Sequence, residues 1–371
     1  MSADRLVAFL QALIRTRSMP GEEAELTDRV VQEWHDLQFD EVRTDAAGNA
    51  LAFVRGREPG PAWLLLTHLD HVSEGDASLW THPPFEGVLE GDTVHGRGAV
   101  DIKGPLAAQT YALAALLARG ERPRRDVWIA AVTQEEVGGE GAAHLVAHPP
   151  GEIGAVIVAE PSSNRLMLGH RGVAHVHVQL RGRAHHASLA LHDQNPFFAL
   201  GELLRRVQAL TFEPHPVVGA SSLTVTQVTH DSGSENLTPN TVTAVLDWRF
   251  SEEDAENRAT LARLLRDLPT DAQLAPLWTA HNTPGFSTAP EHPLARLVAP
   301  YAAASQGDVG ATPGVWKFAT DGRYTHAAGW PTVGWGPGDE GLAHTTQERV
   351  SVPEMQAYAT ALADLLSRET F

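Results

Sequence analysis

The sequence contains no cysteine among its 371 residues. This absence excludes disulfide bonds, thiolate metal sites and cysteine nucleophiles. A metal bound by this chain must therefore be held by histidine, aspartate and glutamate side chains.

Long apolar segments are also lacking. No stretch approaches the ~20 apolar residues that cross a bilayer. The N-terminal residues, MSADRLVAFLQALIRTRS, carry charges at Asp4, Arg5 and Arg15. They have neither the basic start nor the unbroken apolar run of a signal peptide, so we expect an amphipathic helix and a cytoplasmic protein.

Positive charge is scarce: 28 Lys and Arg stand against 46 Asp and Glu, which gives a net charge of −18. An acidic chain repels phosphate backbones and anionic lipids, so we expect neither nucleic acid nor a membrane as a partner. Hydrophobic residues make up 43% of the sequence, as in an ordinary globular enzyme with a substantial core.

The first part of the chain alternates strand and helix patterns. Short apolar runs at 63–66, 127–132 and 155–159 each end in polar residues, and residues 105–119 have helical spacing. Strands separated by helices predict a mainly parallel α/β sheet with flanking helices, whose ligands bind beyond the carboxyl ends of the strands.

The middle of the chain has a different pattern. Apolar and polar residues alternate in three segments, two helical segments lie between and after them, and a last strand is expected near 272–277. The order β-α-β-β-α-β is typical of a ferredoxin-like α+β domain. The α/β pattern resumes after about residue 282, which predicts a catalytic domain of residues 1–172 and 282–371 with an inserted domain of residues 173–281.

Two motifs carry candidate site residues in the first half. T-H-L-D-H at 67–71 places His68 and Asp70 on one side of an extended segment, where a metal ligand needs an orienting partner. A hydrogen-bonded surface pair is the alternative. G-R-G-A-V-D-I-K-G at 96–104 surrounds Asp101 with glycines that permit close approach, although Asp101 could also cap the helix that follows.

Further acidic residues follow the other predicted strands. T-Q-E-E at 133–136 places Glu135 and Glu136 after a buried strand, where adjacent carboxylates are costly without a positive partner. A solvated acidic turn is the alternative. Glu160 follows the third strand, and His344 lies in the later segment G-P-G-D-E-G-L-A-H-T. These oxygen and nitrogen donors suit Zn²⁺, Mn²⁺ or Co²⁺.

The order of these motifs resembles the co-catalytic di-zinc aminoacylase and carboxypeptidase family, which includes acetylornithine deacetylase, succinyl-diaminopimelate desuccinylase and glutamate carboxypeptidase. The resemblance covers essentially the whole chain and implies a di-zinc exopeptidase-like fold with two Zn²⁺, or Co²⁺ or Mn²⁺ in their place. It implies metal ligation by His68, Asp101, Glu136, Glu160 and His344, with Asp101 bridging, Glu135 as general acid/base and Asp70 as the residue that orients His68.

The inserted segment resembles the family's lid and dimerisation domain. G-R-A-H-H-A-S at 182–188 resembles the motif whose histidine, here His186, stabilises the oxyanion in a partner subunit, which implies a homodimer. Asn236 or Asn240 and Arg249 match residues that contact the substrate, while an ordinary ion pair with Asp247 is the alternative for Arg249.

The segment T-D-G-R at 320–323 resembles the deacetylase and desuccinylase branches. By this resemblance Thr320, Asp321 and Arg323 line the acyl-group or side-chain pocket, and a tight Asp-Gly turn is the alternative. Histidines outside the motifs are expected at the surface; these are His82, His144, His148, His192 and His215.

The resemblance therefore implies a zinc-dependent hydrolase that cleaves the amide bond of a small N-acyl amino acid. A carboxypeptidase or dipeptidase acting on short peptides is the alternative within the same family. A non-catalytic relative that binds an amino acid would be indicated by loss of a ligand or of Glu135, and all of these residues are present.

Overall fold

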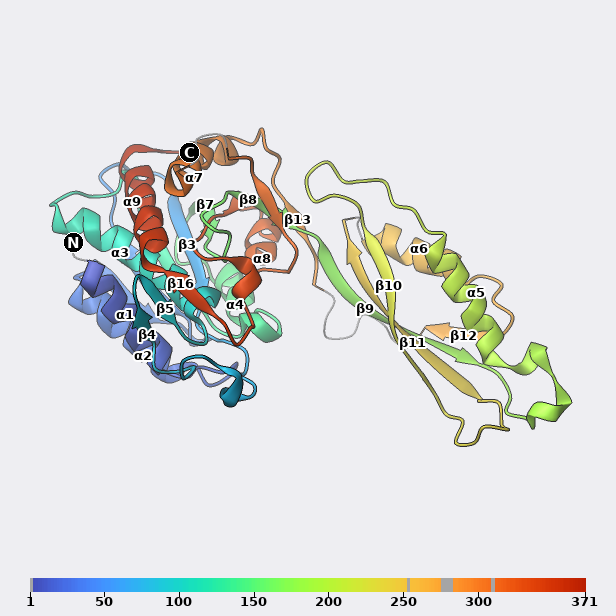
Figure 1. The fold of residues 1–371 in the computed structure, drawn as a ribbon. Helices are drawn as coiled ribbons and strands as arrows, with labels where there is room; N and C mark the ends of the chain where they lie inside the picture. The colour runs from blue at the N-terminus through green and yellow to red at the C-terminus, as the bar shows by residue number, and fades with distance from the viewer. Residues whose placement is uncertain (1–2, 252–253, 275–282, 308–310) are drawn as a thin grey trace. The chain divides into compact units, whose positions relative to one another are not determined.

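The computed structural model describes residues 3–251, 254–274, 283–307 and 311–371. The chain forms two compact units. The first comprises residues 1–169, 286–316 and 320–371, and the second comprises residues 170–285 and 317–319. The predicted inserted segment, 173–281, lies inside the second unit. Figure 1 shows the elements of both units.

A nine-stranded sheet organises the first unit, in the order β1-β2-β6-β3-β7-β15-β8-β13, with β14 paired to β8. Its four central strands, β6, β3, β7 and β15, run parallel, and antiparallel strands flank them. The strands are β1 Glu41–Thr44, β2 Ala50–Val54, β3 Ala62–His68, β6 Val127–Val132, β7 Ile153–Val158, β8 Met167–His170, β13 Phe286–Ser287, β14 Gly314–Trp316 and β15 Thr332–Gly334.

The register of the central strands positions the candidate residues. β3, β6 and the last four residues of β7 are buried, as expected of parallel strands that are covered on both faces. His68 lies opposite Val132 of β6, and Leu66 lies opposite Val158 of β7. The segments that follow these three strands therefore begin at one edge of the sheet.

Seven α-helices accompany the sheet in the described part of this unit. They are α1 Ala3–Arg15, α2 Ala24–Asp36, α3 Gly104–Ala118, α4 Glu140–Ala147, α7 Pro293–Gln306, α8 Gly322–Ala327 and α9 Val352–Arg368. Helix α3 is buried on nearly all sides because it packs between the sheet and the helices α1 and α9, the second of which lies beside it in Figure 1. Its apolar composition follows from that position.

A small antiparallel sheet lies in the same unit, in the order β16-β5-β4. Its strands are β4 Val88–Glu90, β5 Thr93–His95 and β16 Arg349–Ser351. Strands β4 and β5 form a hairpin around Gly91, whose positive φ of 61° suits the turn. The segment that follows β5 leads directly into the Asp101 motif.

The second unit contains the elements β9 Gly172–Arg181, α5 Pro196–Gln208, β10 Ser222–His230, β11 Thr241–Phe250, α6 Asp254–Leu265 and β12 Asp271–Leu274. Its sheet has the order β10-β11-β9-β12 and is antiparallel throughout. This β-α-β-β-α-β arrangement is the ferredoxin-like one, so the predicted fold class is confirmed. The last part of the strand expected at 272–277 lies outside the described residues.

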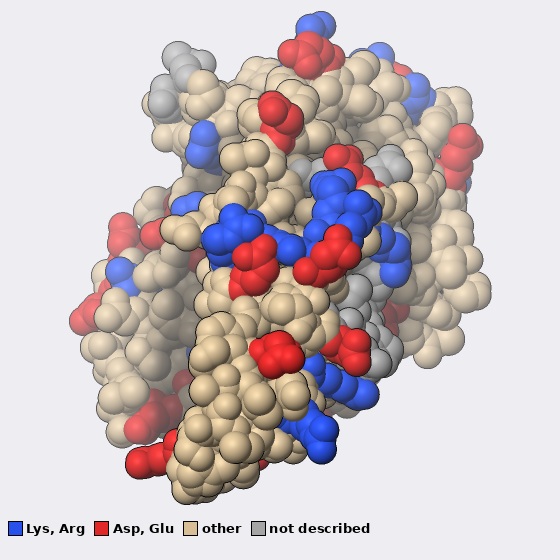
Figure 2. Space-filling view, turned by 90° about the vertical axis from the view of Figure 1, so that its right-hand side faces the viewer, with Lys and Arg blue, Asp and Glu red and all other residues tan. Residues whose placement is uncertain are grey.

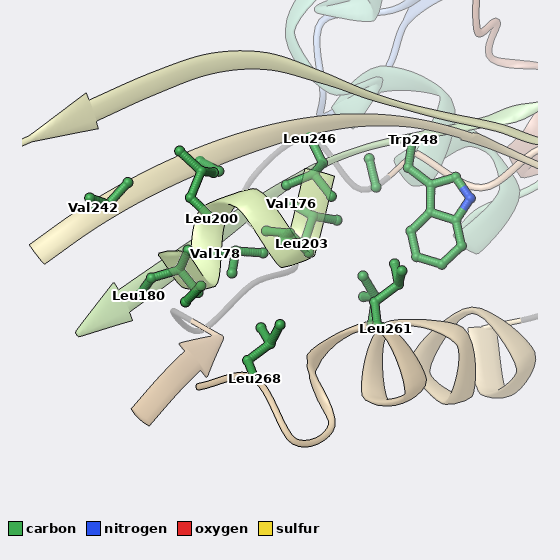
Figure 3. Packing of buried hydrophobic residues seen from close by; sticks show 14 of the residues in the cluster. Val176, Val178, Leu180, Leu200, Leu203, Val242, Leu246, Trp248, Leu261 and Leu268 are labelled. Atoms are coloured by element: carbon green, nitrogen blue, oxygen red, sulfur yellow. The ribbon is translucent and has the colours of Figure 1, made fainter. Parts of the chain in front are cut away.

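The core of the second unit lies between its sheet and its helices, as Figure 3 shows. Alternate residues of β9 and β11 are buried, among them Val176, Leu246 and Trp248. Leu203 of α5 and Leu261 of α6 complete the cluster from the helical side. Burial of each such side chain contributes about 1.5–3 kcal/mol, so the alternation of apolar residues fixes which face of the sheet points inward.

Charge is mixed on the face of the molecule drawn in Figure 2, where basic and acidic side chains alternate among broad uncharged areas. The net charge of −18 therefore does not form a single acidic field on that face. Within the described residues, no helix combines the length and the apolar character needed to cross a bilayer.

Candidate dinuclear metal site

Five predicted ligands converge at the carboxyl edge of the parallel strands. His68 is the last residue of β3, Glu136 lies four residues beyond β6, and Glu160 lies two residues beyond β7. Asp101 comes from the glycine-rich segment before α3, and His344 comes from the loop after β15. All five belong to the first unit.

Asp101 lies between the two histidines and directs one carboxylate oxygen at each. His68 Nε2 is 3.0 Å from Asp101 Oδ1, and His344 Nε2 is 3.2 Å from Asp101 Oδ2. Glu160 Oε1 is 3.7 Å from His68 Nε2, and Glu136 Oε1 is 3.1 Å from His344 Nε2. The donors therefore form two groups, each with one imidazole and one terminal carboxylate, which share Asp101.

The electrostatics of this cluster indicate a need for positive charge. Burial raises the pKa of Glu160 and of Glu135 well above the ordinary glutamate value, and it raises the pKa of Glu136 as well. Hydrogen bonds to Asp101 and Glu136 raise the pKa of His344 to about 10. Carboxylates crowded in a buried site repel one another unless cations separate them.

The donor set fits two divalent cations. His68, Asp101 and Glu136 each offer a ligand atom, and these atoms all lie within 4.8 Å of one another. Three protein donors for each ion, with one carboxylate shared, leave open positions of the kind that catalytic metal sites keep. The only donor types are imidazole and carboxylate, which suits Zn²⁺, Mn²⁺ or Co²⁺.

Asp70 connects the T-H-L-D-H motif with the T-Q-E-E motif in a way that the sequence did not indicate. The main-chain oxygen of Asp70, rather than its carboxylate, lies 3.0 Å from His68 Nδ1. The carboxylate accepts the backbone N–H groups of Glu135 and Glu136, both at 3.0 Å, and lies 3.5 Å from the His68 ring. Asp70 therefore contacts the His68 ring and also holds the backbone of the two glutamates, and its role in orienting a metal ligand stays a prediction.

A buried ion pair holds the backbone at Asp101, and the sequence analysis did not predict it. Glu348 Oε1 accepts the backbone N–H groups of Val100 and Asp101 at 3.1 and 3.2 Å. Arg97 pairs with the other oxygen of Glu348, and both side chains are buried. The sequence offered one indication of this pair, which is the position of Arg97 inside the G-R-G motif. The residues around Glu348 give no indication that it pairs with Arg97.

The T-D-G-R segment lies against the loop that follows Glu136. Thr320, Asp321 and Arg323 are all buried. The Arg323 guanidinium donates to the main-chain oxygen of Gly138 at 2.9 Å and lies 3.5 Å from Asp321. Burial raises the pKa of Asp321 to about 6. In this structure Arg323 holds the loop that follows Glu136, and the contact of these three residues with a substrate stays a prediction.

The remaining candidates lie in the second unit. His186 Nε2 is 3.3 Å from the Asn236 side-chain amide, whereas the side-chain oxygen of Asn240 accepts the Ala184 N–H at 2.9 Å. Of the two asparagines, Asn236 is the one that contacts His186, and which of them contacts a substrate stays a prediction. The other nitrogen of His186, Nδ1, accepts the N–H of Ser188 at 3.2 Å.

Arg249 forms the ion pair that the sequence left open as an alternative. Its guanidinium makes two contacts with Asp247, at 2.8 and 3.1 Å, and His175 lies 3.3 Å from the same carboxylate. A grip on a substrate carboxylate would require Arg249 to exchange this partner, and such a role stays a prediction.

Comparisons with known proteins identify the family of the chain. The sequence profile of Peptidase family M20/M25/M40 matches residues 64–368. A succinyl-diaminopimelate desuccinylase from Alkalilimnicola ehrlichii is 31% identical over 252 residues, which are 65% of this chain and 67% of the relative.

Two solved structures share the fold. A tripeptidase from Staphylococcus aureus has a TM-score of 0.80 at 17% identity, over 99% of this chain and 98% of its own. A dinuclear metal-binding peptidase of the M20 family from Bacillus subtilis has a TM-score of 0.73 at 15% identity, over 98% and 97%.

Proposed function

Because the chain belongs to peptidase family M20/M25/M40, we propose that this hydrolase uses two zinc ions to cleave the amide bond of a small N-acyl amino acid. The observation that carries the proposal is the position of Asp101, whose two oxygens face His68 and His344 separately. One ion would be held by His68, Asp101 and Glu160, and the other by His344, Asp101 and Glu136.

The bound ions would supply positive charge that acidifies a water molecule and polarises the amide carbonyl. Glu135 would take the proton of the attacking water on its carboxylate and deliver it to the leaving amine nitrogen. The hydrogen bonds from the Glu135 and Glu136 amides to Asp70 support this role, because they fix the backbone from which the Glu135 carboxylate projects.

The choice of an acylated amino acid rests on the desuccinylase name of the sequence relative and on the T-D-G-R segment. A carboxypeptidase or dipeptidase remains the second candidate, because the family's fold also serves peptidases. The cytoplasmic location expected from the sequence stays a prediction.

We propose further that the second unit dimerises and that His186 completes the active site of the partner subunit. Strand β10 is an edge strand whose residues are mostly exposed. Exposed apolar side chains lie on this strand and on α5; they are Val228, Phe197 and Phe198. Such an edge is suited to pairing with a second copy. His186 Nε2 lies 3.3 Å from the Asn236 side-chain amide, and this nitrogen would have to exchange that partner for the oxyanion in order to donate to it.

The substrate class is tested by assaying zinc-loaded protein against N-succinyl and N-acetyl amino acids alongside dipeptides. Glu135→Gln is the control, and it should lower kcat about 10²–10⁴-fold while still binding metal. Release of amine from the acylated amino acids, lost in the variant, would support the deacylase. Cleavage of dipeptides alone would move the protein to the peptidase branch.

The partner-supplied histidine is tested by mixing two inactive variants, His186→Ala and Glu135→Gln. If His186 acts on the partner's site, a mixed dimer contains one complete site, and equal mixing should restore about a quarter of wild-type activity. If His186 acts within its own chain, every combination lacks a complete site and the mixture stays inactive.

A further inference from the structure

A second histidine and carboxylate cluster lies in the first unit and shares no residue with the dinuclear site. It consists of His82, Glu90 and His95. His82, which was expected at the surface, is half-buried, with its side chain 21% exposed; that of His95 is 18% exposed. The Glu90 side chain is 70% exposed and leaves the cluster open to solvent on one side.

Three donor atoms converge in this cluster. His82 Nε2 lies 3.3 Å from Glu90 Oε2, and His95 Nε2 lies 3.9 Å from the same oxygen. The two imidazole rings have their centroids 4.5 Å apart. One ligand atom from each residue lies within 4.8 Å of the other two, so one ion could touch all three after small side-chain movements.

The backbone holds these residues in place before any ion binds. In the β4–β5 hairpin, Glu90 pairs with Thr93, so Glu90 and His95 occupy diagonal positions on one face. His82 precedes Pro83 and Pro84, whose rings restrict the backbone on both sides of the peptide bonds.

This loop is also tied to the segment beyond the hairpin. Pro84 accepts the backbone N–H of Arg97 at 2.8 Å, and the Gln11 side-chain amide donates to the main-chain oxygen of Gly87 at 2.7 Å. The binding of an ion would therefore restrict few additional backbone and side-chain torsions. The loss of conformational entropy on metal binding is correspondingly small.

The positive charge of a nearby arginine would weaken the binding of a cation to this cluster. Arg349 of β16 lies opposite His95, although its guanidinium donates to the main-chain oxygen of Gln347 at 3.0 Å. The Glu90 carboxylate offsets part of this charge. A divalent ion bound by two imidazoles and one carboxylate remains the arrangement that satisfies all three side chains at once.

We propose that His82, Glu90 and His95 form a third divalent-metal site, separate from the dinuclear centre. Two imidazole nitrogens and one carboxylate oxygen select a borderline cation such as Zn²⁺, Cu²⁺ or Ni²⁺ over Mg²⁺ or Ca²⁺. Water completes the coordination on the exposed side. The bound ion cross-links the loop at His82 to the β4–β5 hairpin and so stabilises the segment that leads into the Asp101 motif.

Metal stoichiometry tests the proposal. Metal-free protein is dialysed against buffered Zn²⁺, and the bound metal is measured by elemental analysis for wild type and His95→Gln. The variant should bind about one metal equivalent per chain fewer than wild type. His148→Gln is the matched control, because His148 also stacks on a neighbouring histidine, His144, with centroids 4.3 Å apart. It should bind as much metal as wild type.

A second variant keeps the test decisive if His95→Gln fails to fold. Glu90→Gln changes an exposed side chain and should weaken the third site at least about tenfold. With Cu²⁺ as the probe, the electron paramagnetic resonance spectrum should show nitrogen coupling that His82→Gln reduces. Equal stoichiometry and affinity in wild type, His95→Gln and Glu90→Gln would overturn the proposal.

Discussion

Replacing Asp70 by asparagine tests whether the two halves of the site are coupled through one carboxylate. Both oxygens of Asp70 accept backbone N–H groups, one from Glu135 and one from Glu136, at 3.0 Å each. Asparagine keeps one acceptor oxygen and replaces the other with an NH₂ group, which cannot accept. One of the two amides must then lose its partner inside a buried site.

The size of the expected effect follows from the loss of one of these two hydrogen bonds. A hydrogen bond to a charged group contributes about 1.5–3 kcal/mol, and a buried donor left without a partner costs about 1–3 kcal/mol. The protein can recover part of this cost only by moving the glutamate backbone away from the new NH₂ group. Such a movement displaces Glu135 and Glu136, so we expect Asp70→Asn to lower kcat or metal affinity about 10–100-fold.

The assay measures kcat at saturating metal, together with metal affinity by calorimetry. Asp76→Asn is the matched control, because the Asp76 carboxylate also accepts a backbone N–H, that of Ser78 at 2.9 Å, at an exposed turn. The control should stay within about twofold of wild type. If Asp70→Asn matches the control in both quantities, the coupling inferred from the structure is wrong.

Three further predictions follow from other parts of the chain. Burial lowers the pKa of His71 from 6.5 to about 3, so the unfolded chain binds more protons in that interval and stability falls as the pH falls. His71→Gln should reduce the loss of unfolding free energy between pH 6.5 and 5 by about 2 kcal/mol, measured by urea titration. Trp248→Ala empties a fully buried position in the second unit and should cost about 3–5 kcal/mol, measured by hydrogen exchange of β9 and β11. Gly139 and Gly21 both have positive φ, but a Cβ at Gly139 would lie 2.3 Å from Asp321 Oδ1, whereas Gly21 has open space. Gly139→Ala should therefore reduce kcat/KM far more than Gly21→Ala, and equal effects would mean that backbone strain alone is responsible.

The convergence of three candidate ligands could be predicted from the sequence because a parallel sheet brings the ends of its strands together. His68, Glu136 and Glu160 each follow a short apolar run, and the register of β3, β6 and β7 then places them at one edge. Asp101 and His344 lie outside this argument, since neither directly follows a central strand. Only the order of the motifs, compared with a known family, assigned them.

Hydrogen-bond partners distant in the sequence could not be predicted. The i, i+2 spacing correctly put Asp70 near His68, but it gave no means of knowing that the carboxylate would accept amides 65 and 66 residues later. The same limit applies to the pairing of Arg97 with Glu348, which are 251 residues apart. Such pairs depend on how loops from different elements meet after folding.

The cluster of His82, Glu90 and His95 could not be predicted either, although these residues are close together in the sequence. The hairpin turn at Gly91 is visible in the sequence, yet the face on which His95 lies depends on the register of β4 and β5. A shift of one residue would place His95 on the opposite face from Glu90. The sequence alone therefore left His82 as an isolated histidine.

The main-chain support of Asp101 is compatible with the proposed role of its carboxylate as a bridge between two cations. Its side-chain oxygens face His68 and His344. Glu348 instead holds the backbone N–H of Asp101, and Arg97 neutralises Glu348 at its other oxygen. The backbone of Asp101 is thus held through its own N–H group. This anchor uses the backbone N–H of Asp101, so it does not compete with the contacts of the carboxylate to His68 and His344.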